Sequence, residues 1–158
     1  MVGQTWPEDW DDRRRGVGCA LCAEGRPDEN EWGVRVFAGD VADAYLQRET
    51  PARGYTVVVF RGRHAADLTE LTDDEVGAFW REVATVARAV EAVFRPCHLN
   101  HQALGNRTPH VHVHVVPRYA DDPSPERPLG EDAWAAARRL DAADLSRQVA
   151  ALRRALNA

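Results

Sequence analysis

The sequence predicts an α+β domain in which an antiparallel sheet of about five strands packs against one long helix, followed by a C-terminal helical extension. Two runs rich in β-branched residues, 55–60 and 110–116, have the composition of strands. Between them, apolar residues recur at helical spacing over 76–94, directly after a capping-box sequence formed by Thr72 and Glu75. The length of 158 residues fits a single domain of this kind.

The first part of the chain contains three predicted strands. Residues 32–39 and 41–46 alternate apolar with other residues and are joined by a tight turn. A loop is expected over 50–54, which contains a proline and a glycine. The run 55–60 is rich in residues that favour strands, and it is expected to form a central strand of the sheet. Residues 61–64, which end at His64, follow it directly.

The long helix is expected over 72–95, where Pro96 ends it. Residues 97–103 have the pattern of a further strand. A loop over 104–109 then returns the chain to the strand that begins at His110, so these two strands are expected to form a hairpin.

Proline also marks the end of this hairpin. Because Pro117 cannot donate to a sheet, we expect the last strand to end there. Beyond it, three prolines predict an irregular connection, and the Ala-, Leu- and Arg-rich residues 131–158 predict one or two helices for packing or dimer contacts. The expected organisation is an N-terminal arm over 1–16, a central domain over 17–120, and a connection with a helical extension over 121–158.

Composition narrows the class of protein. A formal net charge of −5 argues against non-specific nucleic-acid binding, although a local pocket can still accept a small anion. No apolar run approaches the ~20 residues that span a bilayer, and the N-terminus lacks a signal-peptide pattern. We therefore expect a cytoplasmic protein. Its three cysteines, an odd number, do not suit a disulfide framework.

Three histidines alternate with valines in the last predicted strand. Side chains two residues apart share a face, so His110, His112 and His114 are expected in one row. Imidazole titrates near neutral pH, which suits metal binding, nucleophilic chemistry or proton transfer. The plain alternative is a half-exposed strand whose polar face happens to consist of histidine.

Cys19 and Cys22 form a Cys-x-x-Cys pair. Two thiolates from one tight turn suit half of a tetrahedral zinc site, whose other ligands would then be histidines from elsewhere. A redox role is the second interpretation, but the following residues do not have a thioredoxin-like pattern. The third interpretation is a pair of unliganded small apolar residues.

Residues 110–116, His-Val-His-Val-His-Val-Val, resemble the His-φ-His-φ-His-φ-φ signature of the histidine triad (HIT) superfamily, where φ is apolar. The resemblance extends to residues 104–110, which are similar to the branch written Leu-Gly-Asn-x-x-Pro-His. Residues 61–64, Arg-Gly-Arg-His, resemble the Pro-Lys-x-His of that family. The Cys-x-x-Cys pair stands where zinc-bearing members carry theirs. The resemblance implies the HIT-like α+β fold.

The resemblance also implies a nucleotide hydrolase or nucleotidyl transferase that acts at an α-phosphate. By match to the motif, His112 would attack the phosphorus and form a nucleotidyl-histidine intermediate, and His114 would hydrogen-bond a non-bridging oxygen. The Asn100 amide and the backbone N–H groups near Gly105 and Asn106 would stabilise negative charge. His110 would orient its neighbour. Expected substrates are a dinucleoside polyphosphate or a nucleoside phosphoramidate.

The loop before the histidines departs from the family pattern. Some members carry a serine or threonine, thought to assist the leaving group, at the place of Arg107; here Thr108 follows it. Both residues are counted among the expected substrate contacts, since Arg107 could itself bind a polyphosphate.

Zinc and a homodimer are further implications of the resemblance. Residue by residue, the ligands of zinc-bearing members correspond to Cys19, Cys22, His64 and His110, a complete tetrahedral set for a structural ion.

Three other functions remain open from the residues: a non-catalytic nucleotide- or zinc-binding module, a nucleotidyl transferase or phosphorylase, and a metalloenzyme with a three-histidine zinc site.

Overall fold

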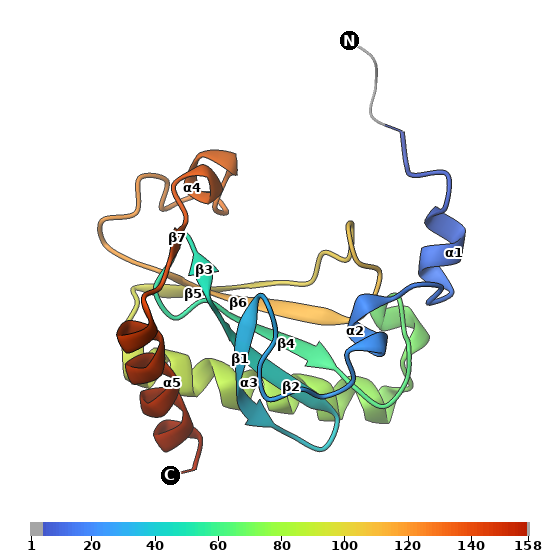
Figure 1. Ribbon diagram of the computed structural model, residues 1–158, viewed down its shortest axis with the longest axis horizontal. Coiled ribbons are helices and arrows are strands. Elements are labelled where there is room, and N and C mark those ends of the chain that lie inside the picture. Colours follow the sequence, from blue (N-terminus) through green and yellow to red (C-terminus); the bar gives the residue numbers. More distant parts are fainter. Residues whose placement is uncertain (1–4, 158) are drawn as a thin grey trace.

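The computed structural model describes residues 5–157 and contains a five-stranded antiparallel sheet of order β1-β2-β4-β6-β5. Figure 1 shows this sheet with the long helix α3 across one face. The strands are β1 (Gly33–Ala38), β2 (Ala42–Gln47), β4 (Thr56–Phe60), β5 (His98–Gln102) and β6 (His112–Arg118). The predicted α+β class, with five strands and a closing β5–β6 hairpin, is confirmed. Residues 1–4 of the predicted arm lie outside the described residues.

Helix α3 (Asp73–Phe94) begins and ends as its sequence predicts. The Thr72 hydroxyl accepts a hydrogen bond from the Glu75 N–H at 3.2 Å, and the Glu75 carboxylate accepts one from the Thr72 N–H at 2.8 Å. This capping box satisfies two N–H groups that a helix start leaves free. At the other end Arg95 adopts a left-handed conformation with φ of 50°, just before Pro96.

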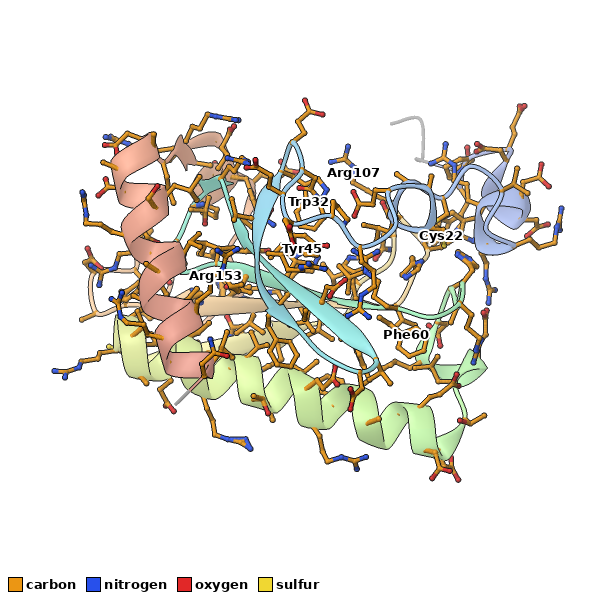
Figure 2. The ribbon with its side chains drawn as sticks, turned by 60° about the horizontal axis from the view of Figure 1, so that its bottom comes forward. Cys22, Trp32, Tyr45, Phe60, Arg107 and Arg153 are labelled. Atoms are coloured by element: carbon orange, nitrogen blue, oxygen red, sulfur yellow. The ribbon has the colours of Figure 1, made fainter. Side chains whose placement is uncertain are left out.

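The two faces of the sheet have different neighbours. Val111, Val113 and Val115 belong to the main core between the sheet and α3. The opposite face carries a smaller buried cluster, formed by Tyr45, Tyr55, Val57, Val59 and Val116. In Figure 2, Phe60 lies on the α3 side of the sheet, whereas Trp32 and Tyr45 lie on the other side. Because side chains alternate along β6, His112 and His114 share this second face with Val116.

The C-terminal extension packs on the same core as the sheet. Helix α5 (Ala142–Leu156) lies against α3 and β1, and its Val149 and Leu152 are buried in the main core. Before it, the short helix α4 (Glu131–Ala135) leads to β7 (Arg138–Arg139), which pairs with β3 (Glu49–Thr50). The extension is therefore fastened to the body by packing and by strand pairing.

Short helices complete the fold. They are α1 (Trp10–Arg14), α2 (Ala20–Ala23) and the 3₁₀ turn η1 (Leu68–Glu70). Within residues 5–157, no helix has both the length and the apolar composition needed to cross a membrane.

The histidine strand differs from its predicted bounds. It starts at His112 rather than His110, and it continues through Pro117 to Arg118. The expectation that Pro117 ends the strand is wrong because β4 pairs with β6 only as far as Val115. Pro117 therefore pairs with β5 alone, opposite Leu99, where a missing donor costs little.

Candidate functional site

The three histidines come together at the start of β6. His112 and His114 lie opposite Val59 and Val57 of β4, and their ring centroids are 4.9 Å apart. His110 precedes the strand and is 2% exposed. Its Nε2–H donates to the Phe60 carbonyl at 2.8 Å, so the end of β4 fixes its ring.

His112 is held in one tautomer by the backbone. Its Nδ1 lies 2.6 Å from the carbonyl oxygen of His110, so Nδ1 carries the proton and donates. Nε2 then has a free lone pair and no hydrogen-bond partner among the described residues. Burial lowers the pKa of His112, which favours the neutral ring. A neutral imidazole with an open Nε2 is a competent base or nucleophile.

His114 is also kept neutral. Burial, with a smaller contribution from nearby His112, lowers the pKa of His114 to about 4. Its Nδ1 lies 3.0 Å from the hydroxyl oxygen of Tyr55, a residue at the entrance of β4. At pH 7 His114 therefore carries a single ring proton, and it can donate only one hydrogen bond at a time.

Cys19, Cys22, His64 and His110 form a cluster beside this row, with all four potential ligand atoms within 4.8 Å of one another. The His110 Nδ1 atom is 3.5 Å from the Sγ atoms of both cysteines, and the His64 Nδ1 atom is 3.5 Å from Sγ of Cys22. This group could hold a metal ion.

Backbone carbonyls aim both histidines of the cluster. Nε2–H of His64 donates to the Arg14 carbonyl at 3.0 Å, as Nε2–H of His110 does to Phe60. Each Nδ1 lone pair is thereby turned toward the cysteines, which is the arrangement usual behind metal-ligating histidines. Gly16 allows the approach of the arm: its φ is +87°, and a Cβ there would lie 2.9 Å from Cγ of His64.

Arg61 ties the cysteine turn to the sheet. It is buried, and it donates to the Leu21 carbonyl of α2 at 2.7 Å and to the buried Asp43 of β2 at 3.1 Å. Asp43 also accepts two hydrogen bonds from Arg26. The sequence analysis did not identify the Arg61–Asp43 pair. The position of Asp43 between apolar strand residues was a usable signal, because a buried carboxylate needs a charged partner.

Asn100 lies on the same sheet face as the histidines, but beside Val116 rather than beside His114. It is opposite Val116, and Gln102 is the residue opposite His114. Its Oδ1 accepts a hydrogen bond from Arg118 at 2.6 Å, which leaves its NH₂ group for other partners. Arg118 was missed as well; it is buried and pairs with Asp122 at 2.5 Å.

The loop over 104–109, whose backbone N–H groups are expected to stabilise negative charge, leads directly to His110. Gly105 has φ of +69°, a conformation that favours glycine. Asn106 and Arg107 are exposed, and the Thr108 carbonyl accepts the His110 N–H at 2.8 Å. Figure 2 places Arg107 on the same side of the sheet as Trp32. No triad histidine has a hydrogen bond to these side chains among the described residues.

A family profile described as "HIT domain" matches residues 33–121, more than half of the chain. The chain belongs to the HIT domain family. A curated relative, "Protein hit" from Bacillus subtilis (strain 168), is 27% identical over 106 residues, which are 58% of this chain and 72% of the relative. Membership of the family supports a function of the nucleotide-binding or hydrolase type in general. The cysteine pair and the C-terminal extension lie outside the matched residues.

Solved structures of HIT proteins share the fold. A histidine triad protein from Bradyrhizobium japonicum aligns with a TM-score of 0.69 and 24% identity, over 80% of this chain and 92% of its own. A zinc-bound histidine triad family protein from Mycobacterium smegmatis aligns with a TM-score of 0.62 and 24% identity, over 89% of this chain and 92% of its own. The HIT-like fold implied by the sequence is thus confirmed.

Proposed function

We propose that this HIT protein hydrolyses nucleotides at the α-phosphate through a nucleotidyl-histidine intermediate on His112. The observation that carries the proposal is the His112 ring, which donates through Nδ1 to the His110 carbonyl and leaves Nε2 unprotonated and open. A nucleophile needs a free lone pair, and this ring has one at neutral pH. The proposed substrates are a dinucleoside polyphosphate or a nucleoside phosphoramidate.

The reaction has two displacements. Nε2 of His112 forms a bond to the α-phosphorus while the bond to the leaving group breaks, and the leaving phosphate or amine departs with that electron pair and gains a proton. Water then attacks the phosphorus, the P–N bond breaks, and a nucleoside monophosphate is released with His112 restored. Each displacement builds charge on the non-bridging oxygens, which fixed donors can stabilise.

Several groups are suited to hold that charge. His114 would donate one hydrogen bond to a non-bridging oxygen. Arg118 donates to the Asn100 oxygen and so orients the amide, whose NH₂ group would donate to a phosphate oxygen. Backbone N–H groups near Gly105 and Asn106 would add donors at the loop, while Arg107 and Thr108 would contact the leaving group.

The test is to mix the protein with each of a panel of nucleotides, quench the reaction with base because the adduct is acid-sensitive, and look for the adduct by mass spectrometry. We expect a nucleoside monophosphate mass on the peptide that contains His112, and none in His112→Asn. Turnover without any adduct in the wild type at early times would refute the covalent route. Nucleotide binding with neither adduct nor turnover across the panel would instead favour a non-catalytic binding module.

We also propose that Cys19, Cys22, His64 and His110 hold a structural zinc ion. With Zn–S near 2.3 Å and Zn–N near 2.0–2.1 Å, a tetrahedral site separates S and N ligand atoms by about 3.5 Å. Three Sγ–Nδ1 distances in this chain are 3.5 Å. The zinc-bound relative from Mycobacterium smegmatis is consistent with the assignment. When bound, zinc would fasten the N-terminal segment to the sheet.

A homodimer is the proposed assembly. The edge strands of the sheet are β5 and β1. The edge at β1 is partly covered, because Val34 forms a bridge with Glu29 and Arg153 of α5 donates to the Arg35 carbonyl. The free edge is therefore the outer side of β5. An uncovered edge strand is a natural pairing surface. Sedimentation should therefore give twice the chain mass at micromolar concentration, and a monomer there would contradict the proposal.

A further inference from the structure

Tyr55 lies between the histidine row and the C-terminal extension. It is 2% exposed, and its hydroxyl oxygen lies 3.0 Å from Nδ1 of His114. The ring of Trp134 from α4 packs against the Tyr55 ring in a T-shaped arrangement, with centroids 5.4 Å apart. Its backbone is fixed too, because Gln47 N–H donates to its carbonyl at 3.0 Å. Tyr55 is therefore held firmly while it touches a residue of the proposed machinery.

The hydrogen bond between Tyr55 and His114 has two possible directions. Burial raises the pKa of Tyr55, so the hydroxyl keeps its proton. His114 is neutral at pH 7 and has one ring proton, as its lowered pKa requires. Either the hydroxyl donates to Nδ1 and the ring proton is on Nε2, or Nδ1–H donates to the hydroxyl oxygen and Nε2 is bare.

The surroundings favour the first direction. His114 is the hydrogen-bond partner of the Tyr55 hydroxyl among the described residues, so donation to Nδ1 is what satisfies this buried proton. A buried donor without an acceptor costs about 1–3 kcal/mol. Nε2 of His114 is not a buried unpaired atom, so its proton can meet solvent or a ligand in the site.

We propose that Tyr55 is a positioning residue whose hydroxyl fixes His114 as the Nε2–H tautomer. In that state His114 can donate to a phosphate oxygen. In the other tautomer a lone pair would face the anion and repel it. The catalytic part of this inference rests on the proposed function, whereas the tautomer itself can be measured without any substrate.

Tyr55→Phe is the matched variant, because it removes the hydroxyl and keeps the ring against Trp134. Nitrogen NMR of ¹⁵N-histidine protein at pH 7 should show His114 protonated at Nε2 in the wild type. In Tyr55→Phe the two His114 nitrogens should move toward an averaged mixture of tautomers. Tyr119→Phe, whose hydroxyl donates to the Arg53 carbonyl at 2.7 Å, is the control and should leave the His114 signals unchanged.

The kinetic arm separates positioning from folding. In Tyr55→Phe we expect kcat to fall by about 10–100-fold, the range found when a residue that orients a metal-ligating histidine is removed. The variant should still unfold cooperatively, because the ring and its packing against Trp134 remain. A His114 protonated at Nδ1 in the wild type, or an unaltered Nε2–H tautomer in Tyr55→Phe, would overturn the inference. If the tautomer behaves as expected but the wild type turns over no nucleotide, the proposed function fails and the inference about Tyr55 stands.

Discussion

His110 contacts the cysteine cluster through its side chain and His112 through its backbone. Its Nδ1 atom lies 3.5 Å from Sγ of Cys19 and of Cys22, while its carbonyl oxygen accepts the Nδ1–H of His112 at 2.6 Å. The first histidine of the triad thus joins the candidate metal site to the candidate nucleophile. A substitution at the candidate metal site should therefore alter the position of His112, because the buried His110 contacts both sites.

Replacement of His112 tests the nucleophile. We expect His112→Asn to lower turnover by roughly 10⁴–10⁶-fold, as removal of a nucleophile does in other covalent enzymes. Nucleotide binding should persist, because the proposed ground-state contacts come from His114, Asn100 and the loop before His110. Single-turnover kinetics with a fluorogenic nucleoside phosphoramidate and a dinucleoside polyphosphate, together with calorimetric binding, measure both effects.

The matched control is His98→Asn, which makes the same substitution on the exposed part of β5. It should keep wild-type rates. Wild-type rates in His112→Asn would exclude the covalent mechanism.

Much of the fold could be predicted because the deciding signals are local. The run 55–60 predicts a strand that is buried on both faces, and the alternation of histidine with valine predicts which face of β6 is buried. The capping box at Thr72 predicts where α3 begins. The family resemblance then supplied the cluster of Cys19, Cys22, His64 and His110, which the structure brings together. Periodicity alone did not identify the partners of the cysteine pair.

What could not be predicted depends on contacts between distant parts of the chain. Three such contacts are the Tyr55–His114 hydrogen bond, the Arg118–Asn100 hydrogen bond and the pairing of β3 with β7. In each, the sequence around one residue does not indicate which distant residue it contacts. The extent of β6 past Pro117 likewise depends on where β4 stops pairing. A sequence pattern predicts that a side chain is buried, but it does not predict which residues pack against that side chain.

The C-terminal extension should be essential for stability. Leu152 of α5 is fully buried in the core against the sheet and α3. Leu152→Ala removes buried apolar volume and should lower the free energy of unfolding by about 2–5 kcal/mol. Leu104→Ala, at a position that is 63% exposed, is the control and should change it little. Equal stabilities of both variants in denaturant titrations would contradict this role of Leu152.

The lowered pKa of His114 predicts a pH dependence of stability. The folded ring has a pKa of about 4 and the unfolded ring about 6.5, so between these values the unfolded chain binds more protons. Stability then rises with pH across this window and is lost as the pH falls from 6.5 to 4. For this group the slope is at most about 1.4 kcal/mol per pH unit.

His114→Gln removes this titration and keeps a polar side chain of similar reach. Urea unfolding at pH 7, 6 and 5 should therefore show a flatter loss of stability for the variant than for the wild type. Parallel curves for the two proteins would mean that His114 is protonated equally in the folded and unfolded states.

Metal content tests the cysteine cluster. Protein purified without added zinc should contain roughly one equivalent per chain, because the four proposed ligands would close a tetrahedral site. Removal of zinc with a chelator should lower Tm, since a structural ion that binds only the folded state stabilises it. Cys22→Ser should lose most of the zinc and show a Tm that the chelator no longer changes.

The chain offers its own control for this experiment in Cys97. This third cysteine is exposed and lies outside the cluster, so Cys97→Ser should keep both the zinc and the chelator-sensitive Tm. Because His110 holds both sites, Cys22→Ser should also slow turnover while His112 is intact, and zinc loading should not rescue it. A wild type that is metal-free and insensitive to the chelator would rule out the zinc site, and the cluster would then be only a packed set of thiols and imidazoles.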